Sequence, residues 1–194
     1  MHRSRTRFVA GLAAAALPLA LLAGCGEDEP EPKFEDPTSE SPSASSTPDE
    51  PEKPTPPAAM EGDDVEGAKA FVEYYFAVMD YAVRSQGTQD LHALATPSCS
   101  TCSGVEQIIE STRKNNGRIV GGKHKVAGIQ LNEIQGEQAV SLFRGRIRVR
   151  TSAQVIRDSG LDGVDGDFPA GLRKYSVVVG RDGGEWKLAD WRPL

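Results

Sequence analysis

The sequence predicts an α+β domain in which three N-terminal helices pack on a strongly curved, four-stranded antiparallel sheet. Two patterns predict this class. From residue 65 the apolar residues recur at spacings of three and four, which is typical of amphipathic helices. From residue 118 they alternate with polar residues, in segments separated by Gly- and Asp-rich turns, which is typical of antiparallel strands. Helices followed by strands of this kind form two packed layers around one core.

The first 24 residues have the organisation of an export signal. A basic start is followed by 16 apolar residues, Phe8 to Ala23, whereas a membrane-spanning helix needs about 20. The segment ends in Leu22-Ala23-Gly24-Cys25, which resembles a bacterial lipobox, where the cysteine thiol is acylated and the chain is cut before it. We therefore expect residues 1–24 to be a lipoprotein signal peptide and Cys25 to be the lipidated residue. The alternative is an ordinary signal peptide followed by an unrelated cysteine.

Lipidation at Cys25 determines where the protein would be found. Acyl chains such as palmitate contribute about 0.8 kcal/mol per buried CH₂, so that two of them anchor a protein stably while one does not. The expected location is the cell membrane, on its extracytoplasmic face.

Residues 25–64 are predicted to be a disordered tether. Nine of the 13 prolines lie between Pro30 and Pro57, and residues 25–64 carry 13 acidic residues against Lys33 and Lys53. Such a composition cannot bury enough apolar surface to offset the entropy of ordering, and prolines and like charges extend it. We expect a spacer; a recognition segment and glycosylation of its Ser and Thr residues are the alternatives.

Three helices are expected between residues 65 and 114. The first begins at Val65, with Asp63 and Glu66 as a capping box, and ends at Gly87 in a left-handed conformation. The second runs from a cap at Thr88 to Ala95 and stops before Pro97. The third occupies residues 101–114 and ends at Asn115-Asn116-Gly117.

The remainder is predicted to be strands at 118–120, 124–134, 139–157, 172–180 and 185–191. Gly121-Gly122 is expected to form a bulge within the first long strand. Gln135-Gly136-Glu137 and Asp182-Gly183-Gly184 are expected turns, and residues 159–171 an expected loop. The domain is therefore assigned to residues 65–194.

Five motifs in this domain carry a resemblance to a known family: Phe71-Val72-Glu73-Tyr74-Tyr75, Cys99-Ser100-Thr101-Cys102, Gly121-Gly122, Phe168-Pro169-Ala170-Gly171 and Gly184 to Trp191. With the order of helices and strands, they resemble an uncharacterised family of actinobacterial lipoproteins within the nuclear transport factor two-like superfamily. The resemblance implies a cone of curved sheet around a long first helix. It also implies a homodimer through the outer face of the sheet, which many relatives form. It implies no particular activity, because that family has none assigned.

Cys99 and Cys102 form a Cys-x-x-Cys motif with three interpretations. A local disulfide is expected outside the membrane. A redox pair would use the low pKa of a cysteine at a helix N-terminus, but redox folds place the motif after a strand. A zinc site needs two more ligands, for which the mature chain offers only His92 and His124 at unsuitable spacing.

Four arginines, Arg144, Arg146, Arg148 and Arg150, alternate along one predicted strand and therefore share one face. One interpretation is a solvent-exposed face with Glu or Asp on neighbouring strands. The other is an anion-binding site for a wall polymer, a phosphate head group or an acidic protein, to which Arg173 and Lys174 could contribute.

The expected cone would enclose a cavity, with Tyr74, Asp80, Tyr81 and His92 as its candidate polar residues. No catalytic constellation, metal motif or cofactor motif is evident in the sequence. Residues 65–194 carry 17 basic and 15 acidic residues, so composition does not favour nucleic-acid binding.

Three functions remain open. The first is a non-catalytic ligand- or protein-binding domain of the cell envelope. The second is a small-molecule enzyme of the isomerase, dehydratase or hydrolase type that uses the cone cavity. The third is a redox protein based on Cys99 and Cys102.

Replacing Cys25 with serine tests the anchor. We expect Cys25→Ser to release the protein from membranes or to block its processing, because the thiol that receives the lipid is lost. Membrane fractionation and the mass of the mature chain measure both effects in a bacterium that processes lipoproteins. Normal processing with unchanged membrane retention would contradict the lipid anchor.

Overall fold

The computed structural model of the chain describes residues 51–135 and 141–194, and it confirms an α+β domain. A short 3₁₀ helix, η1 (Ala58–Glu61), precedes three α-helices: α1 (Val65–Ser85), α2 (Gln89–Ala93) and α3 (Ser100–Lys114). Seven strands follow: β1 (Arg118–Gly121), β2 (His124–Gln135), β3 (Ser141–Thr151), β4 (Gln154–Arg157), β5 (Gly166–Phe168), β6 (Gly171–Asp182) and β7 (Glu185–Pro193). Cys25 and the predicted turn at Gly136-Glu137 lie outside the described residues.

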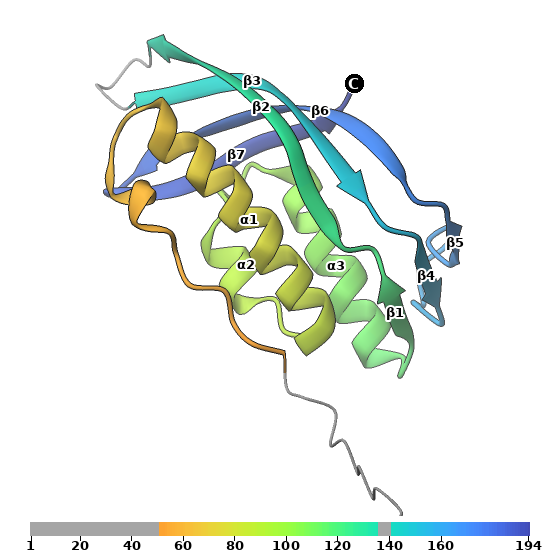
Figure 1. Cartoon of the computed structure of the whole chain (residues 1–194). Helices are drawn as coiled ribbons and strands as arrows, with labels where there is room; N and C mark the ends of the chain where they lie inside the picture. The colour runs from red at the N-terminus through yellow and green to blue at the C-terminus, as the bar shows by residue number, and fades with distance from the viewer. Residues whose placement is uncertain (1–50, 136–140) are drawn as a thin grey trace, which may run out of the picture. The chain divides into compact units, whose positions relative to one another are not determined.

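The strands form two antiparallel sheets (Figure 1). The larger sheet has the order β2-β3-β6-β7, and the smaller one the order β1-β4-β5. The prediction of a single four-stranded sheet is therefore wrong in one respect, because the predicted loop at 159–171 contains β5 and a second sheet exists.

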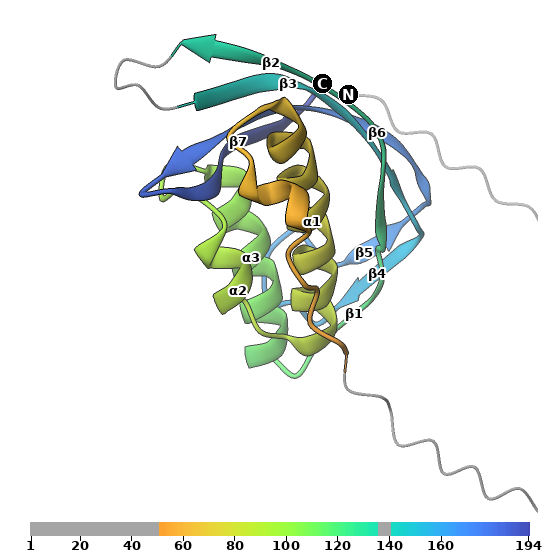
Figure 2. The ribbon, with the colours of Figure 1, turned by 60° about the vertical axis from the view of Figure 1, so that its left-hand side comes forward.

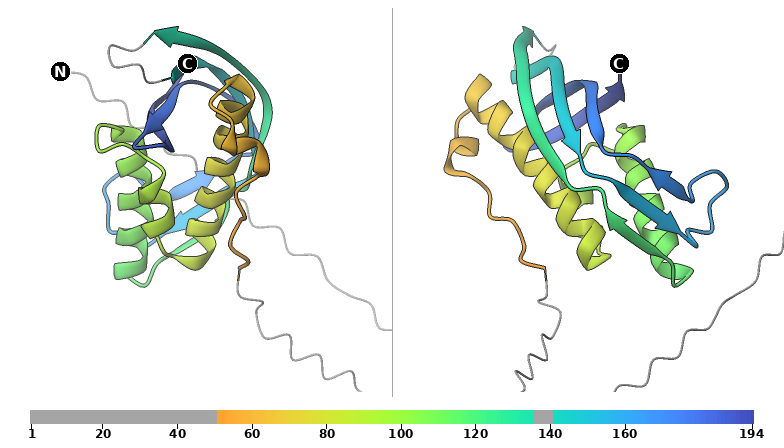
Figure 3. Two further views of the ribbon diagram at one scale, coloured as in Figure 1. Left: turned by 90° about the vertical axis from the view of Figure 1, so that its left-hand side faces the viewer. Right: turned by 45° about the vertical axis from the view of Figure 1, so that its right-hand side comes forward.

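The smaller sheet prolongs the larger one beyond a bend. β1, β4 and β5 are the ends of the chain segments that continue as β2, β3 and β6, and they pair in the same order (Figure 3). Gly121 and Gly122 have positive φ angles of 77° and 73°, which glycine adopts without a Cβ penalty. Pro169, at the corresponding place before β6, has no N–H for a ladder. Gly121-Gly122 is thus a bend between sheets, whereas the register shifts in β2 at Val126/Gly128.

The larger sheet arches over α1, which lies on its concave side (Figure 2). The helix presents an apolar face to the sheet, as its spacing of apolar residues predicts, and Phe71, Tyr75 and Phe76 are almost completely buried. These rings meet aromatic residues of the last strand: Phe71 stacks on Trp186 at 6.0 Å and Phe76 packs edge-on against Trp191 at 5.4 Å. The space under the arch is therefore filled by an aromatic core.

α1 begins at Val65 as predicted, but both of its capping residues differ by one position from the prediction. Asp64, not Asp63, is the N-cap, and its Oδ1 accepts hydrogen bonds from the N–H groups of Glu66 and Gly67 at 3.1 and 2.9 Å. At the other end Gln86 is left-handed with φ 56°, in place of Gly87.

α2 is shorter than predicted because the residues after it pair with β7. Leu188 donates its N–H to Leu94 O at 2.8 Å, and Thr96 donates its N–H to Leu188 O at 3.0 Å. This short parallel bridge removes residues 94–96 from the helix. α3 then begins directly after Cys99, one residue earlier than predicted.

Residues 60–62, which lie within the predicted tether, contact the domain. Arg181 of β6 donates hydrogen bonds from Nη2 to the carbonyl oxygens of Met60, Glu61 and Gly62 at 2.9–3.1 Å. Trp186 donates its indole N–H to Met60 O at 2.8 Å, and the guanidinium lies 5.1 Å from the centre of that indole. These contacts extend the folded unit to the N-terminal side of the predicted boundary at residue 65.

No helix within residues 51–135 and 141–194 is long and apolar enough to cross a bilayer.

The N-cap assignment gives a stability prediction. We expect Asp64→Ala to lower the free energy of unfolding by about 1 kcal/mol, because two N–H groups of α1 lose their acceptor. The matched variant Asp63→Ala removes an exposed carboxylate that lies 2.7 Å from Arg181 Nε. Exposed ion pairs contribute less, so we expect about 0.5 kcal/mol or less for it. Urea unfolding compares the two; a larger loss for Asp63→Ala would contradict the assignment.

Candidate functional site

The four predicted arginines lie on the outer face of β3, away from α1. Burial along the strand alternates: Phe143, Ile147 and Val149 are buried, while Arg144, Arg146, Arg148 and Arg150 are exposed. The strand therefore places one face in the aromatic core and four guanidinium groups in solvent.

The directly paired residues on both neighbouring strands carry no carboxylate. Across β3, each arginine lies between one residue of β2 and one of β6, in four rows: Asn132-Arg144-Val178, Gln130-Arg146-Ser176, Gly128-Arg148-Lys174 and Lys125-Arg150-Leu172. Acidic neighbours would be expected if the arginines were merely a solvated face with compensating charges. In the described residues the rows instead add two lysines.

We call this surface the basic face and define it by Lys125, Arg144, Arg146, Arg148, Arg150, Lys174 and Arg192. Arg192 joins because it pairs with Ser176, in the row of Arg146. Asp190, opposite Val178, lies on the same side, and its Oδ2 is 2.9 Å from Arg192 Nε. Arg173 does not contribute, because it pairs with buried Val149 and so lies on the opposite side of β6 from Lys174.

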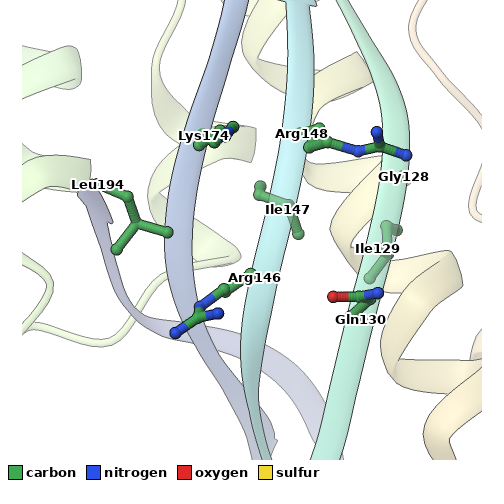
Figure 4. Close-up of a pocket in the computed structure, with 8 residues that line it drawn as sticks. All are labelled: Gly128, Ile129, Gln130, Arg146, Ile147, Arg148, Lys174 and Leu194. Carbon is green, nitrogen blue, oxygen red and sulfur yellow. The ribbon is translucent and has the colours of Figure 1, made fainter.

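A depression of about 640 Å³ lies in the middle of the basic face (Figure 4). The two central arginines diverge there: Arg146 extends over β6, and Arg148 extends over β2 toward Gly128. A Cβ on Gly128 would lie 2.7 Å from Arg148 Nη2, so the glycine provides the space in which this guanidinium lies. The depression thus has guanidinium groups on both sides of β3, and Gln130 of β2 and Lys174 of β6 also line it.

This arrangement is electrostatically unfavourable in the free protein. Side chains on one face of a strand recur about every 7 Å, and two unit charges at about 7 Å in water repel by about 0.6 kcal/mol. This is an upper value for Arg146 and Arg148, because their guanidinium groups extend to opposite sides of β3. The nine ion pairs found in the described residues include no partner for Arg144, Arg146, Arg148 or Arg150. A bound anion would remove the repulsion and accept charge-assisted hydrogen bonds.

The predicted disulfide is confirmed. Cys99 and Cys102 are bonded, with a Cα–Cα distance of 5.3 Å, and both residues are buried at the start of α3. Their bond closes the first turn of α3 immediately after the bridge between residues 94–96 and β7. Within residues 51–135 and 141–194, no cluster of three His, Cys, Asp or Glu residues is placed to hold a metal ion.

The four predicted cavity residues do not converge on one cavity. His92 is largely exposed, with its Nδ1 2.9 Å from Glu106 Oε2. Tyr74 is half-buried on α1, and desolvation raises the pKa of its hydroxyl. Tyr81 is also half-buried, and Asp80 contacts the start of β2.

The concave side holds a different polar group, the hydroxyl of Tyr75. It has no hydrogen-bond partner in the described residues, and burial raises its pKa far above the usual range for tyrosine. It is therefore a neutral phenol in the aromatic core.

Sequence reasoning missed the pairing of Asp80 with His124. His124 donates its backbone N–H to Asp80 Oδ2 at 2.9 Å, and its Nδ1 lies 2.6 Å from Asp80 Oδ1. Both side chains are mostly buried, beside a groove of about 460 Å³ between α1 and β2. Their separation of 44 positions in the sequence gives no spacing signal. Because both carboxylate oxygens contact His124, the pair fixes the first residue of β2 to α1.

The fold and the basic face define an α+β domain with an outward cationic sheet surface. The chain belongs to the Family of unknown function (DUF6318), whose profile matches residues 34–191. This confirms the predicted membership of an uncharacterised family. No curated protein shows significant similarity to the chain.

Three solved structures show distant similarity. The intermembrane space region of chloroplast protein ARC6 is 9% identical, with a TM-score of 0.48, and the match covers 68% of this chain and 96% of that one. An uncharacterized protein with a cystatin-like fold from Caulobacter vibrioides is 10% identical, with a TM-score of 0.46, covering 68% and 89%. A periplasmic fragment of TraM is 12% identical, with a TM-score of 0.43, covering 67% and 96%.

The uncompensated charge gives a second stability prediction. We expect Arg146→Gln to raise the free energy of unfolding by about 0.5 kcal/mol at low ionic strength, because repulsion from Arg144 and Arg148 is relieved. The control is Arg173→Gln, an exposed arginine on the same sheet but off the basic face, for which we expect no gain. Urea unfolding at low salt and at 1 M NaCl measures both; the gain should vanish at high salt, where the Debye length is about 3 Å. Destabilisation by Arg146→Gln at low salt would show that the arginine is structurally compensated.

Proposed function

We propose that this protein is a membrane-anchored lipoprotein whose folded domain binds an anionic ligand on its basic face. The observation that carries the proposal is the set of four arginines on β3, whose cross-strand neighbours are neutral or cationic. Arginine presents several N–H donors in a planar fork, which suits carboxylate and phosphate oxygens. A surface that lowers the stability of the protein when no ligand is bound is typical of a binding site.

The lipid anchor and the tether are parts of the same proposal. Their support is the sequence: the apolar segment, the lipobox-like residues 22–25 and the Pro- and acid-rich stretch that follows. A lipidated Cys25 would place the domain at the extracytoplasmic side of the cell membrane, within reach of wall polymers and envelope proteins. We also assign the domain to the nuclear transport factor two-like superfamily, which the arch of the sheet around α1 supports.

A homodimer through the outer face remains a prediction that the charges oppose. Two copies packed face to face would bring two basic faces together, and like charges in contact cost several kcal/mol across an interface. Such a dimer would need an anion between the copies.

A second candidate is a small-molecule enzyme, favoured by the Asp80–His124 pair. An imidazole oriented by a carboxylate is a common general base. The pair lies at the rim of the domain, beside the groove that Glu73 and Arg84 also line. The interior that a cone enzyme would use for its substrate is occupied by Phe71, Tyr75 and Trp186. We therefore rank binding above catalysis.

Anion binding is tested with inorganic pyrophosphate and the full chain in a non-ionic detergent. We expect pyrophosphate to bind and to raise the unfolding temperature at low ionic strength. The double variant Arg146→Gln/Arg148→Gln should bind at least about 10-fold more weakly, because it loses two charge-assisted hydrogen-bond donors. Calorimetric titration measures the affinity.

The control for this experiment is Arg113→Gln/Arg118→Gln, which changes the net charge equally at exposed positions on α3 and β1. It should bind pyrophosphate as the unaltered chain does. Equal losses in both double variants would mean that net charge alone attracts the anion, and the proposed site would be wrong.

A further inference from the structure

The basic face is longer than any small anion. Arg144 and Arg150 are six residues apart on one strand, which corresponds to roughly 20 Å. A single phosphate or carboxylate can contact one or two guanidinium groups, and the others would stay uncompensated. The spacing therefore favours a ligand that carries several charges in a line.

A second depression continues the first along β3. It has a volume of about 440 Å³ and is lined by Lys123, Lys125 and Arg150, with Leu172 on the β6 side. Arg148 lines the first depression, and Arg150 is the next residue on the same face. The two depressions thus form one interrupted basic groove in the direction of the strand, with a cation at each step.

Apolar side chains lie in the groove between the cations. Leu172 and Leu194 are 50% and 66% exposed, and they line the second and the first depression. A ligand that carries only charges would leave them in water, whereas a chain of charges joined by carbon-containing units could cover them.

The curvature of the sheet favours a flexible linear ligand over a planar membrane surface. The basic face is on the outside of the arch over α1, so it is convex (Figure 2). A planar bilayer surface would contact only the crest of such a face, but a flexible linear chain can follow it from Arg144 to Lys125. Tetrahedral phosphate oxygens also match the paired N–H groups of arginine.

We propose that the basic face binds a linear phosphodiester polymer that lies along β3 and engages the row from Arg144 to Arg150. The proposal rests on the anion-binding function above and specifies its ligand class. Affinity should then depend on chain length, because each further phosphate meets a further cation until the row is filled.

The test uses fluorescently labelled oligomers of propanediol phosphodiester with one, two, four, six and eight phosphates, which contain no base or sugar. With the full chain in a non-ionic detergent, we expect the six-phosphate oligomer to bind at least about 100-fold more tightly than the single phosphate. The gain should level off near the length of the row. The slope of log affinity against log salt concentration should steepen in parallel, because more counterions are released.

Two variants locate the polymer on the groove. Arg148→Gln/Arg150→Gln should lose most of the length dependence, while Arg113→Gln/Arg118→Gln should keep it. Gly128→Ala changes no charge but places a methyl group against the Arg148 guanidinium, so we expect about 10-fold weaker binding of the six-phosphate oligomer. Gly104→Ala, whose added Cβ meets no atom within 4 Å, is its control and should bind normally.

Each other outcome contradicts a defined part of the proposal. Affinity that grows only in proportion to the number of phosphates would overturn the polymer but leave the anion site. A hexaglutamate peptide or anionic-lipid vesicles that bind as tightly as the six-phosphate oligomer would overturn the phosphodiester class. Failure of every anion, pyrophosphate included, would overturn the proposed function itself.

Discussion

The packing of α1 into the concave side of the larger sheet is the constraint on which the rest of the domain depends. The aromatic residues of α1 can be covered only if the sheet bends around them, and strands that bend in this way present one set of alternate residues inward. In β3 the inward set is Phe143, Ile147 and Val149. The arginines that alternate with these residues therefore face solvent. The basic face is therefore a consequence of core packing, held in a fixed geometry by a rigid layer.

Periodicity predicted most of the fold because it reports burial directly. The spacing of apolar residues located α1 and α3 to within one residue, and alternation located the strands of the larger sheet. What it could not predict depends on contacts between distant segments. α2 is short because residues 94–96 pair with β7, and the second sheet arises where three strands bend together at Gly121-Gly122, Ser152-Ala153 and Pro169-Ala170. A local pattern contains neither kind of information.

The candidate site could likewise be predicted only in part from the local sequence pattern. The row on β3 could be found from its period of two, but whether it was compensated depended on strand register, which places Lys125 and Lys174 beside Arg150 and Arg148. The space for Arg148 depends on a glycine next to a register shift in the partner strand. Residue type suggested the candidate cavity residues, but the face of α1 that packs against the sheet carries Phe71, Tyr75 and Phe76, and His92 lies on α2.

The contact between Arg181 and the carbonyl groups of residues 60–62 determines how the domain responds to mechanical load. Tension applied from the N-terminal side of α1 acts first on η1. There the Arg181 guanidinium donates hydrogen bonds to three carbonyl oxygens, and the Trp186 indole donates a hydrogen bond to one of the same oxygens. The force is therefore transferred to the β6–β7 hairpin before it can unwind the first turn of α1. Since β6 also pairs with β3, this force would be carried by the same sheet that presents the basic face.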